Sequence, residues 1–155
     1  MPEKGAEGVI VCQGANIGGW SLYAKGGKLK YCYNWGGFKH FMVEAAGKLP
    51  AGEHQVRMEF AYAGGGLGKG GKVRLYTDGK KVGEGEIPAT LAMVFSADDG
   101  LDVGEDSGAP VSPDYGSRDN GFNGTVKGVQ LSIAEDDGKH LVDPKEAIRV
   151  ALARQ

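Results

Sequence analysis

Short runs of alternating hydrophobic and polar residues follow one another along most of this chain. The run His54–Tyr62 (HQVRMEFAY) is typical, because its hydrophobic residues at positions 56, 58 and 60 alternate with polar ones. Strict alternation over this length is characteristic of a half-buried β-strand. Runs of this kind, together with one continuous apolar run at Gly8–Gln13 that is typical of a buried strand, predict eight strands. They are Gly8–Gln13, Trp20–Ala24, Lys28–Asn34, Phe38–Ala45, His54–Tyr62, Lys72–Asp78, Lys81–Ile87 and Gly124–Ala134.

Glycine-rich reversals separate these runs. The chain has 28 glycines in 155 residues, well above the average of about 7%. Gly26-Gly27 predicts a hairpin turn between the second and third runs, and Asp78-Gly79 is a strong type I′ turn signal. Many short strands joined by tight turns predict an all-β protein. We expect an antiparallel β-sandwich of the jelly-roll or concanavalin-like kind.

The C-terminal stretch 141–155 has a different pattern. Asp143-Pro144-Lys145-Glu146 resembles a helix start, with an N-cap, a proline at N1 and a glutamate at N3. An apolar stripe follows at Ala147, Ile148, Ala151 and Leu152. A helix of about 12 residues is marginal alone in water. The sequence therefore predicts a β-sandwich domain over residues 1–140 and a short α-helix over 141–155, packing on that domain or on a partner.

Charge and hydropathy exclude several classes of partner. The formal net charge is -2, and the basic residues form no cluster of the kind that binds nucleic acid. No apolar run approaches the ~18 residues of a membrane span. The first residues lack the apolar core of a signal peptide, so the cytoplasm is the default expectation. Cys12 and Cys32 lack the spacing of a zinc site, and we interpret them as half-buried thiols.

An acidic stretch near residue 100 is the candidate metal site. Dense carboxylates are the hard oxygen ligands that calcium prefers. The spacing is not that of an EF-hand, and a solvated loop is the alternative. The candidate ligands are Asp98, Asp99, Asp102, Glu105 and Asp106. No other cofactor is expected.

Aromatic residues in several strands suggest a sugar-binding surface. Flat aromatic rings beside polar groups hold sugars by apolar contact, although such residues more often belong to the core. A sulfated sugar would also require an arginine. The candidate ligand-binding residues are Trp20, Trp35, Tyr62 and Arg118.

Catalytic motifs are not found. The loop Gly64–Lys72 (GGGLGKGGK) fits part of a phosphate-binding loop, but Val73 stands where that motif needs Ser or Thr. A strand is predicted after it, rather than the required helix. The three histidines are scattered, and no Ser-His-Asp arrangement can be drawn. We therefore predict no catalytic residue.

Several stretches together resemble the C-terminal region of bacterial arylsulfatases, over roughly Gly8 to Ile133. They are Val11–Tyr23, Leu29–Asn34, Leu49–His54, Arg57–Tyr76, Asp78–Gly85 and Phe95–Tyr115. The sulfatase family hydrolyses sulfate esters with a formylglycine made within a C/S-x-P-x-R motif. Cys12 is followed by Gln-Gly-Ala-Asn, and Cys32 by Tyr-Asn-Trp-Gly. Neither cysteine lies in that motif, so the nucleophile of the family cannot form.

The resemblance implies a non-catalytic accessory domain. Such a domain would act in packing, assembly or substrate presentation, with a sulfatase catalytic domain or a second copy of the chain as partner. The alternative is a lectin-like module that binds glycans.

Overall fold

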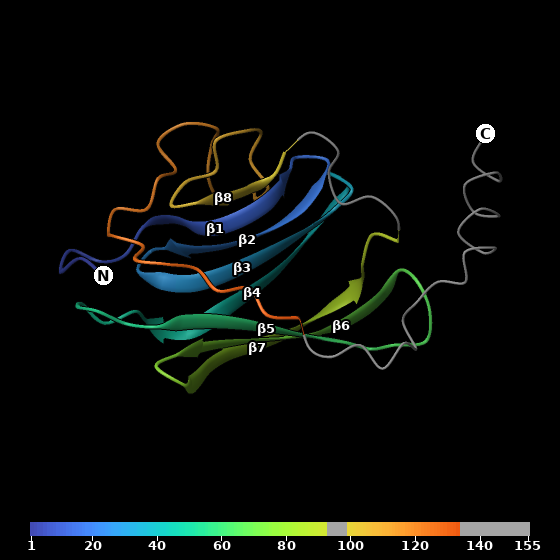
Figure 1. The fold of residues 1–155 in the computed structure, drawn as a ribbon, viewed down its shortest axis with the longest axis horizontal. Coiled ribbons are helices and arrows are strands. Elements are labelled where there is room, and N and C mark those ends of the chain that lie inside the picture. The colour runs from blue at the N-terminus through green and yellow to red at the C-terminus, as the bar shows by residue number, and fades with distance from the viewer. Residues whose placement is uncertain (93–98, 134–155) are drawn as a thin grey trace.

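The alternating runs form strands in the computed structural model, which describes residues 1–92 and 99–133. The strands are β1 (Gly8–Ala15), β2 (Gly18–Lys25), β3 (Lys28–Trp35), β4 (Lys39–Lys48), β5 (Val56–Tyr62), β6 (Lys69–Thr77), β7 (Lys80–Ala89) and β8 (Leu101–Val103). They make two antiparallel sheets (Figure 1). Sheet A has the order β4-β3-β2-β1-β8, and sheet B has the order β5-β6-β7.

The main hydrophobic core lies between the two sheets. Sheet A contributes Leu29 and Tyr31 from β3, and sheet B contributes Val73 and Leu75 from β6. The sheets approach most closely between β4 and β7. A Cβ at position 85 of β7 would lie 2.7 Å from a methyl group of Val43, so glycine is needed there. The β-sandwich predicted from the sequence is thus confirmed.

The connectivity of the sandwich is simple. Strands β1 to β4 are consecutive neighbours in sheet A, and β5 to β7 are consecutive neighbours in sheet B. A jelly roll instead crosses repeatedly between its two sheets, so the observed order is that of two successive meanders. The helix predicted over residues 141–155 lies outside the described residues.

Two segments differ from their predictions. Residues 124–133 were predicted as part of a long strand, but they form no strand and cross the open side of the sandwich, where Val126 packs against the core. Conversely, β8 lies in the stretch predicted as an acidic loop. It pairs with β1 through Val11↔Val103 and Gln13↔Leu101.

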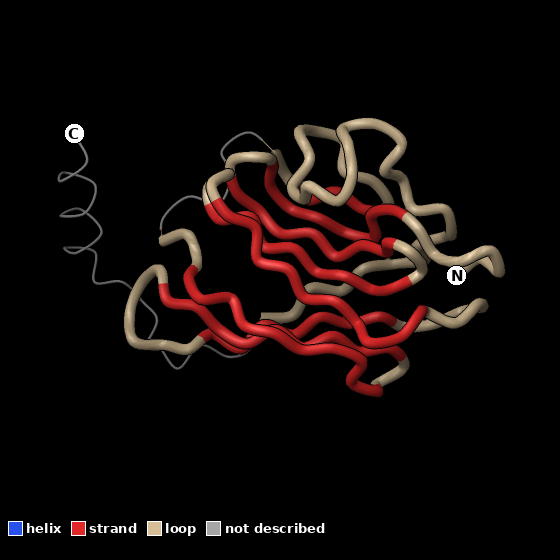
Figure 2. The backbone as a smooth tube through the Cα atoms, turned by 180° about the vertical axis from the view of Figure 1, so that it is seen from behind, coloured by secondary structure: helices blue, strands red, loops and turns tan. Residues whose placement is uncertain are grey.

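A long loop follows β8 and returns over sheet A, as the tan segments of Figure 2 show. Residues 104–122, here named the cover loop, close the face of sheet A that points away from sheet B. They form a second small core around Val111, with Val9, Cys12, Tyr23 and Cys32. Sheet A is therefore buried on both faces. The described residues contain no helix that could cross a membrane.

Candidate functional site

The cover loop is held on sheet A by a buried carboxylate. Asp106 accepts hydrogen bonds from the Val111 N–H at 3.0 Å and from the Tyr115 hydroxyl at 2.8 Å. Its own N–H donates to the Asn120 side chain at 2.9 Å, and the Asn120 amide donates back to the Asp106 carbonyl at 2.8 Å. A buried charge is tolerated only when it is hydrogen-bonded in this way. Asp106 therefore has a structural role in shaping the loop.

Asp106 also belongs to a cluster that includes one thiol. Ligand atoms of Cys12, Asp102 and Asp106 lie within 4.8 Å of one another. The Asp102 carboxylate accepts hydrogen bonds from the Ser107 N–H at 2.9 Å and from its hydroxyl at 2.7 Å. Both carboxylates thus already have protein donors.

The predicted calcium ligands do not all converge on this cluster. Asp102 and Asp106 come together, whereas the carboxylate of Asp99 lies against Gly108 and Glu105 is exposed. Asp98 lies outside the described residues. Calcium usually takes six to eight oxygen ligands, and two carboxylates beside a thiol supply few of them. Calcium binding stays a prediction.

Both thiols are buried and free. Burial, and then the charges of Asp106 and Asp102, raise the pKa of Cys12 to about 12. Burial likewise raises the pKa of Cys32 to about 12. Ser21 of β2 lies between the two cysteines in the register, so their Cα atoms are about 9–10 Å apart, too far for a disulfide. Neither thiol is prepared to act as a nucleophile.

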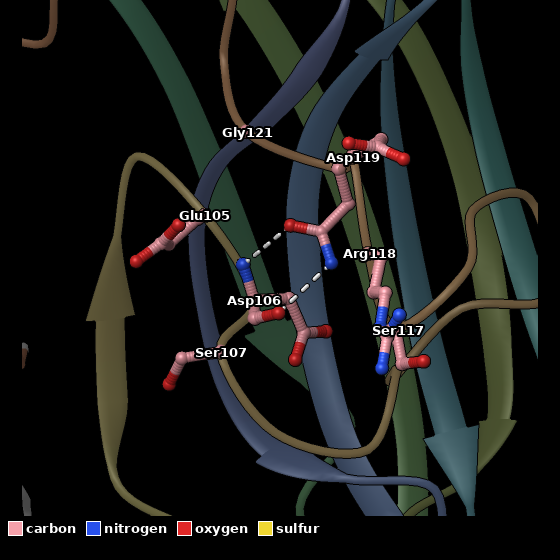
Figure 3. Close-up of a pocket in the computed structure, with 8 residues that line it drawn as sticks. Glu105, Asp106, Ser107, Ser117, Arg118, Asp119 and Gly121 are labelled. Carbon is pink, nitrogen blue, oxygen red and sulfur yellow. Dashed lines mark hydrogen bonds between the residues drawn. The ribbon is translucent and has the colours of Figure 1, made fainter.

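A polar cavity of about 390 Å³ opens beside Asp106 (Figure 3). Its lining includes Glu105, Ser107, Arg118 and Asp119. Arg118 is exposed, and its guanidinium makes no hydrogen bond or ion pair with another residue in the described part of the chain. The cavity therefore offers one available cation among several acidic groups.

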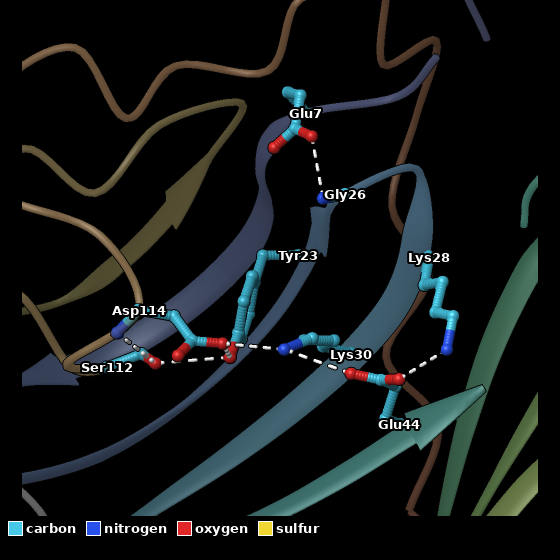
Figure 4. Close-up of polar contacts among 8 residues, drawn as sticks. All are labelled: Glu7, Tyr23, Gly26, Lys28, Lys30, Glu44, Ser112 and Asp114. Carbon is cyan, nitrogen blue, oxygen red and sulfur yellow. Dashed lines mark hydrogen bonds and ion pairs between the residues drawn. The ribbon is translucent and has the colours of Figure 1, made fainter. Parts of the chain in front are cut away.

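A chain of ion pairs fastens the other part of the cover loop to sheet A (Figure 4). Lys30 lies between Glu44, at 3.0 Å, and Asp114, at 3.1 Å. The Tyr23 hydroxyl donates to Asp114 at 2.7 Å. Burial alone would raise the pKa of Asp114, but the hydrogen bonds from Tyr23 and Lys30 outweigh it and the pKa is lowered. The ionised form of Asp114 thus holds the loop to β2 and β3.

The four predicted sugar-binding side chains lie in separate places. Trp20 and Trp35 pack against the core between the sheets, and the hydroxyl of Tyr62 forms hydrogen bonds within the β5–β6 loop. Arg118 lies on the other side of sheet A, in the cover loop. Its cavity is lined by none of the three aromatic residues.

One end of the sandwich exposes large apolar side chains. Phe38 is 88% exposed and Ile17 is 57% exposed. They lie in the β3–β4 and β1–β2 turns, and Leu67, also exposed, lies in the β5–β6 loop at the same end (Figure 1). The Trp35 and Phe38 rings are 6.4 Å apart. We name Ile17, Trp35, Phe38 and Leu67 the apolar end.

Asn34 makes the apolar end rigid. This fully buried side chain donates to the carbonyls of Ala15 at 3.2 Å and Asn16 at 3.0 Å, and it accepts from the Gly37 N–H at 2.8 Å. It therefore ties the two turns together. Gly37 has φ 75°, and a Cβ there would lie 2.8 Å from the Asn16 carbonyl oxygen. The turns that carry Phe38 and Ile17 are held in one geometry.

No sequence pattern indicated that Asn34, Ile17 and Phe38 contribute to a surface. Phe38 was predicted to begin a strand, and only the Gly36-Gly37 pair before it indicated a turn. The role of Asn34 depends on residues distant in sequence, so no local pattern could have revealed it.

Comparison with protein-family models, with curated proteins and with solved structures gave no match.

Proposed function

We propose that this chain is a non-catalytic accessory domain that packs on a sulfatase catalytic domain through the apolar end. The observation that carries the proposal is the exposure of Phe38 and Ile17 on turns that Asn34 holds rigid. Aromatic side chains presented on a rigid surface are typical anchors of protein interfaces, because they bury much area at little entropic cost.

The other large surface is less suited to docking. The outer face of sheet B is charged, and its groups already pair with one another. Arg57 forms an ion pair with Glu59 and lies 4.1 Å from the centre of the Tyr76 ring. The Tyr76 hydroxyl donates to Glu59 at 2.8 Å. Such a surface is stable in water and gains little from being covered.

The buried reactive groups also support a non-catalytic role. Both thiols have raised pKa values and lie inside the small core under the cover loop. Asp106, the most buried carboxylate described, is occupied by donors from its own loop. A nucleophile must be both activated and accessible.

Calorimetry with a sulfatase catalytic domain that lacks its own C-terminal region tests the proposal. We expect saturable binding by the wild-type chain, and binding weakened by about tenfold or more in Phe38→Ser, because one aromatic anchor is lost. Met42→Ser is the matched control, since Met42 is an exposed apolar residue on β4. Absence of binding, or hydrolysis of an aryl sulfate by the purified chain, would contradict the proposal.

A glycan-binding module is the second candidate function. The exposed Arg118 side chain favours it, because a guanidinium with no partner in the described residues suits a sulfate group, whereas Glu105 and Asp119 in the same cavity oppose one. Binding to sulfated sugars should then be lost in Arg118→Ala and kept in Arg74→Ala, which removes a cation from sheet B instead. A glycan array with no sulfated ligand would eliminate this candidate.

A further inference from the structure

Residues 124–133 expose both their main chain and their apolar side chains. No backbone hydrogen bond joins them to another described residue. Leu131 is 59% exposed and Ile133 is 96% exposed, and Val129 is also exposed. Main-chain groups need a hydrogen-bond partner, and no described residue supplies one here, so this segment can pair with another strand.

The segment has the pattern of a strand, and its start is anchored. Val129, Leu131 and Ile133 alternate with small or uncharged polar residues, so an extended backbone places the three on one face. Val126 packs against the core between the sheets. Lys127 forms an ion pair with Glu53 at 2.5 Å. These two contacts hold one end of the segment against the sandwich and leave the rest exposed.

We propose that residues 128–132 form an antiparallel strand pair with the same residues of a second copy of this chain. A two-fold axis at Gln130 places Val129 of one copy opposite Leu131 of the other, and Ile133 then lies beyond the shared stretch, opposite Lys127. The six exposed apolar side chains of the two copies then lie on one shared face. The two Gln130 amides meet at the axis, where each can donate to the other and accept from it.

A second copy fits the segment because the segment is complementary to itself. Residues 128–132 carry no charge, and the next pair places Lys127 opposite the uncharged Ile133, so pairing with an identical strand brings no like charges together. The free edges of the described sheets are less suitable. β5 carries Arg57 and Glu59, and β8 has Asp102 at its middle. The uncharged segment has no opposite charges to pair with these side chains. Two-fold dimers are also the commonest assemblies of identical chains.

Sedimentation equilibrium over a concentration series tests the inference. The wild-type chain should reach twice its monomer mass of 16.2 kDa. Gln130→Pro should stay monomeric, because proline removes an N–H from the ladder and blocks pairing. The fold should be unaffected, since residue 130 makes no backbone hydrogen bond within the described chain. Leu131→Lys should raise the dimer dissociation constant by about tenfold or more.

Two controls separate this inference from the proposed function. Met42→Lys changes an exposed apolar residue outside the segment and should dimerise normally. Phe38→Ser should weaken binding to the catalytic domain by about tenfold or more and keep the dimer. Gln130→Pro should keep that binding and lose the dimer. A wild-type chain that is monomeric at all concentrations overturns the inference, as does a dimer that Gln130→Pro leaves intact.

Discussion

At the scale of single residues, Asn34 determines the shape of the apolar end. Its amide also donates to the Val111 carbonyl at 3.2 Å, so one side chain connects two turns and the cover loop. Replacement by alanine would leave several buried carbonyl groups and the Gly37 N–H without this partner. Each unsatisfied buried group carries a desolvation cost.

Asn34→Ala should therefore lower the free energy of unfolding by about 2–4 kcal/mol. Urea denaturation followed by fluorescence measures the change. Gln55→Ala, at an exposed position, is the control and should change stability by less than about 0.5 kcal/mol. A stability loss in Asn34→Ala no larger than in the control would mean that the amide contacts do not hold the turns.

The two thiols should be unreactive in the folded protein. Burial raises the pKa of Cys12 and Cys32 to about 12, and the thiolate is the reactive form. Alkylation by iodoacetamide at pH 8, followed by mass spectrometry, should modify neither cysteine until denaturant is added. Rapid modification of Cys12 in the native protein would contradict both its burial and its raised pKa.

At the scale of elements, the cover loop is fastened to sheet A by Asp114. Asp114→Asn keeps the shape of the side chain but removes the charge that pairs with Lys30. The expected cost is about 1 kcal/mol, because the pair is partly exposed. Hydrogen exchange should quicken in residues 104–122 and stay unchanged in β2 and β3. Uniform acceleration over the whole sandwich would show that Asp114 does not act locally.

A second fastening, between His54 and Asp78, should depend on pH. His54 lies just before β5, and Asp78 lies in the β6–β7 turn. The distance between His54 Nδ1 and the Asp78 carboxylate is 2.6 Å. The hydrogen bond with Asp78, and then that with the Ala51 carbonyl, raises the pKa of His54. The hydrogen bond with His54, and then that from the Gln55 N–H, lowers the pKa of Asp78.

The signs of these shifts define a pH window. The raised pKa of His54 adds to the free energy of unfolding. This stabilisation is complete below the ordinary histidine pKa of about 6.5 and is lost as pH rises through the raised pKa. The lowered pKa of Asp78 also stabilises the folded protein. This stabilisation is complete above about pH 4 and is lost as pH falls through the lowered pKa. The difference in urea midpoint between wild type and His54→Gln should thus be largest near pH 5 and shrink above pH 7. A difference that does not vary with pH would refute the ion pair.

Most of the strands, but not all, could be predicted from the sequence. Alternation and glycine turns located the first seven strands, because both signals are local. The pattern in Gly124–Ala134 is equally clear, yet residues 124–133 are unpaired. Alternation shows that side chains would lie on two opposite faces if the segment were extended. Strand pairing also requires the free edge of another strand beside it, which alternation does not reveal. β8 was missed for the converse reason, since its three residues become a strand only through their bonds to β1.

At the scale of the whole molecule, the candidate surfaces arise from contacts between distant residues. Phe38 and Ile17 meet at one end because Asn34 connects their turns, and Cys12 joins Asp102 and Asp106 because β1 pairs with β8. Asp102 and Asp106 were among the predicted metal ligands only because acidic residues are dense near residue 100. The partner residues could not be predicted, because they depend on the register between strands.

Hydrogen exchange of this chain with and without a sulfatase catalytic domain tests the central claim most directly. We expect slower exchange in the turns that carry Ile17 and Phe38 and in the loop that carries Leu67, with little change in β6. Protection confined to the charged outer face of sheet B, or binding with no protection at the apolar end, would contradict it.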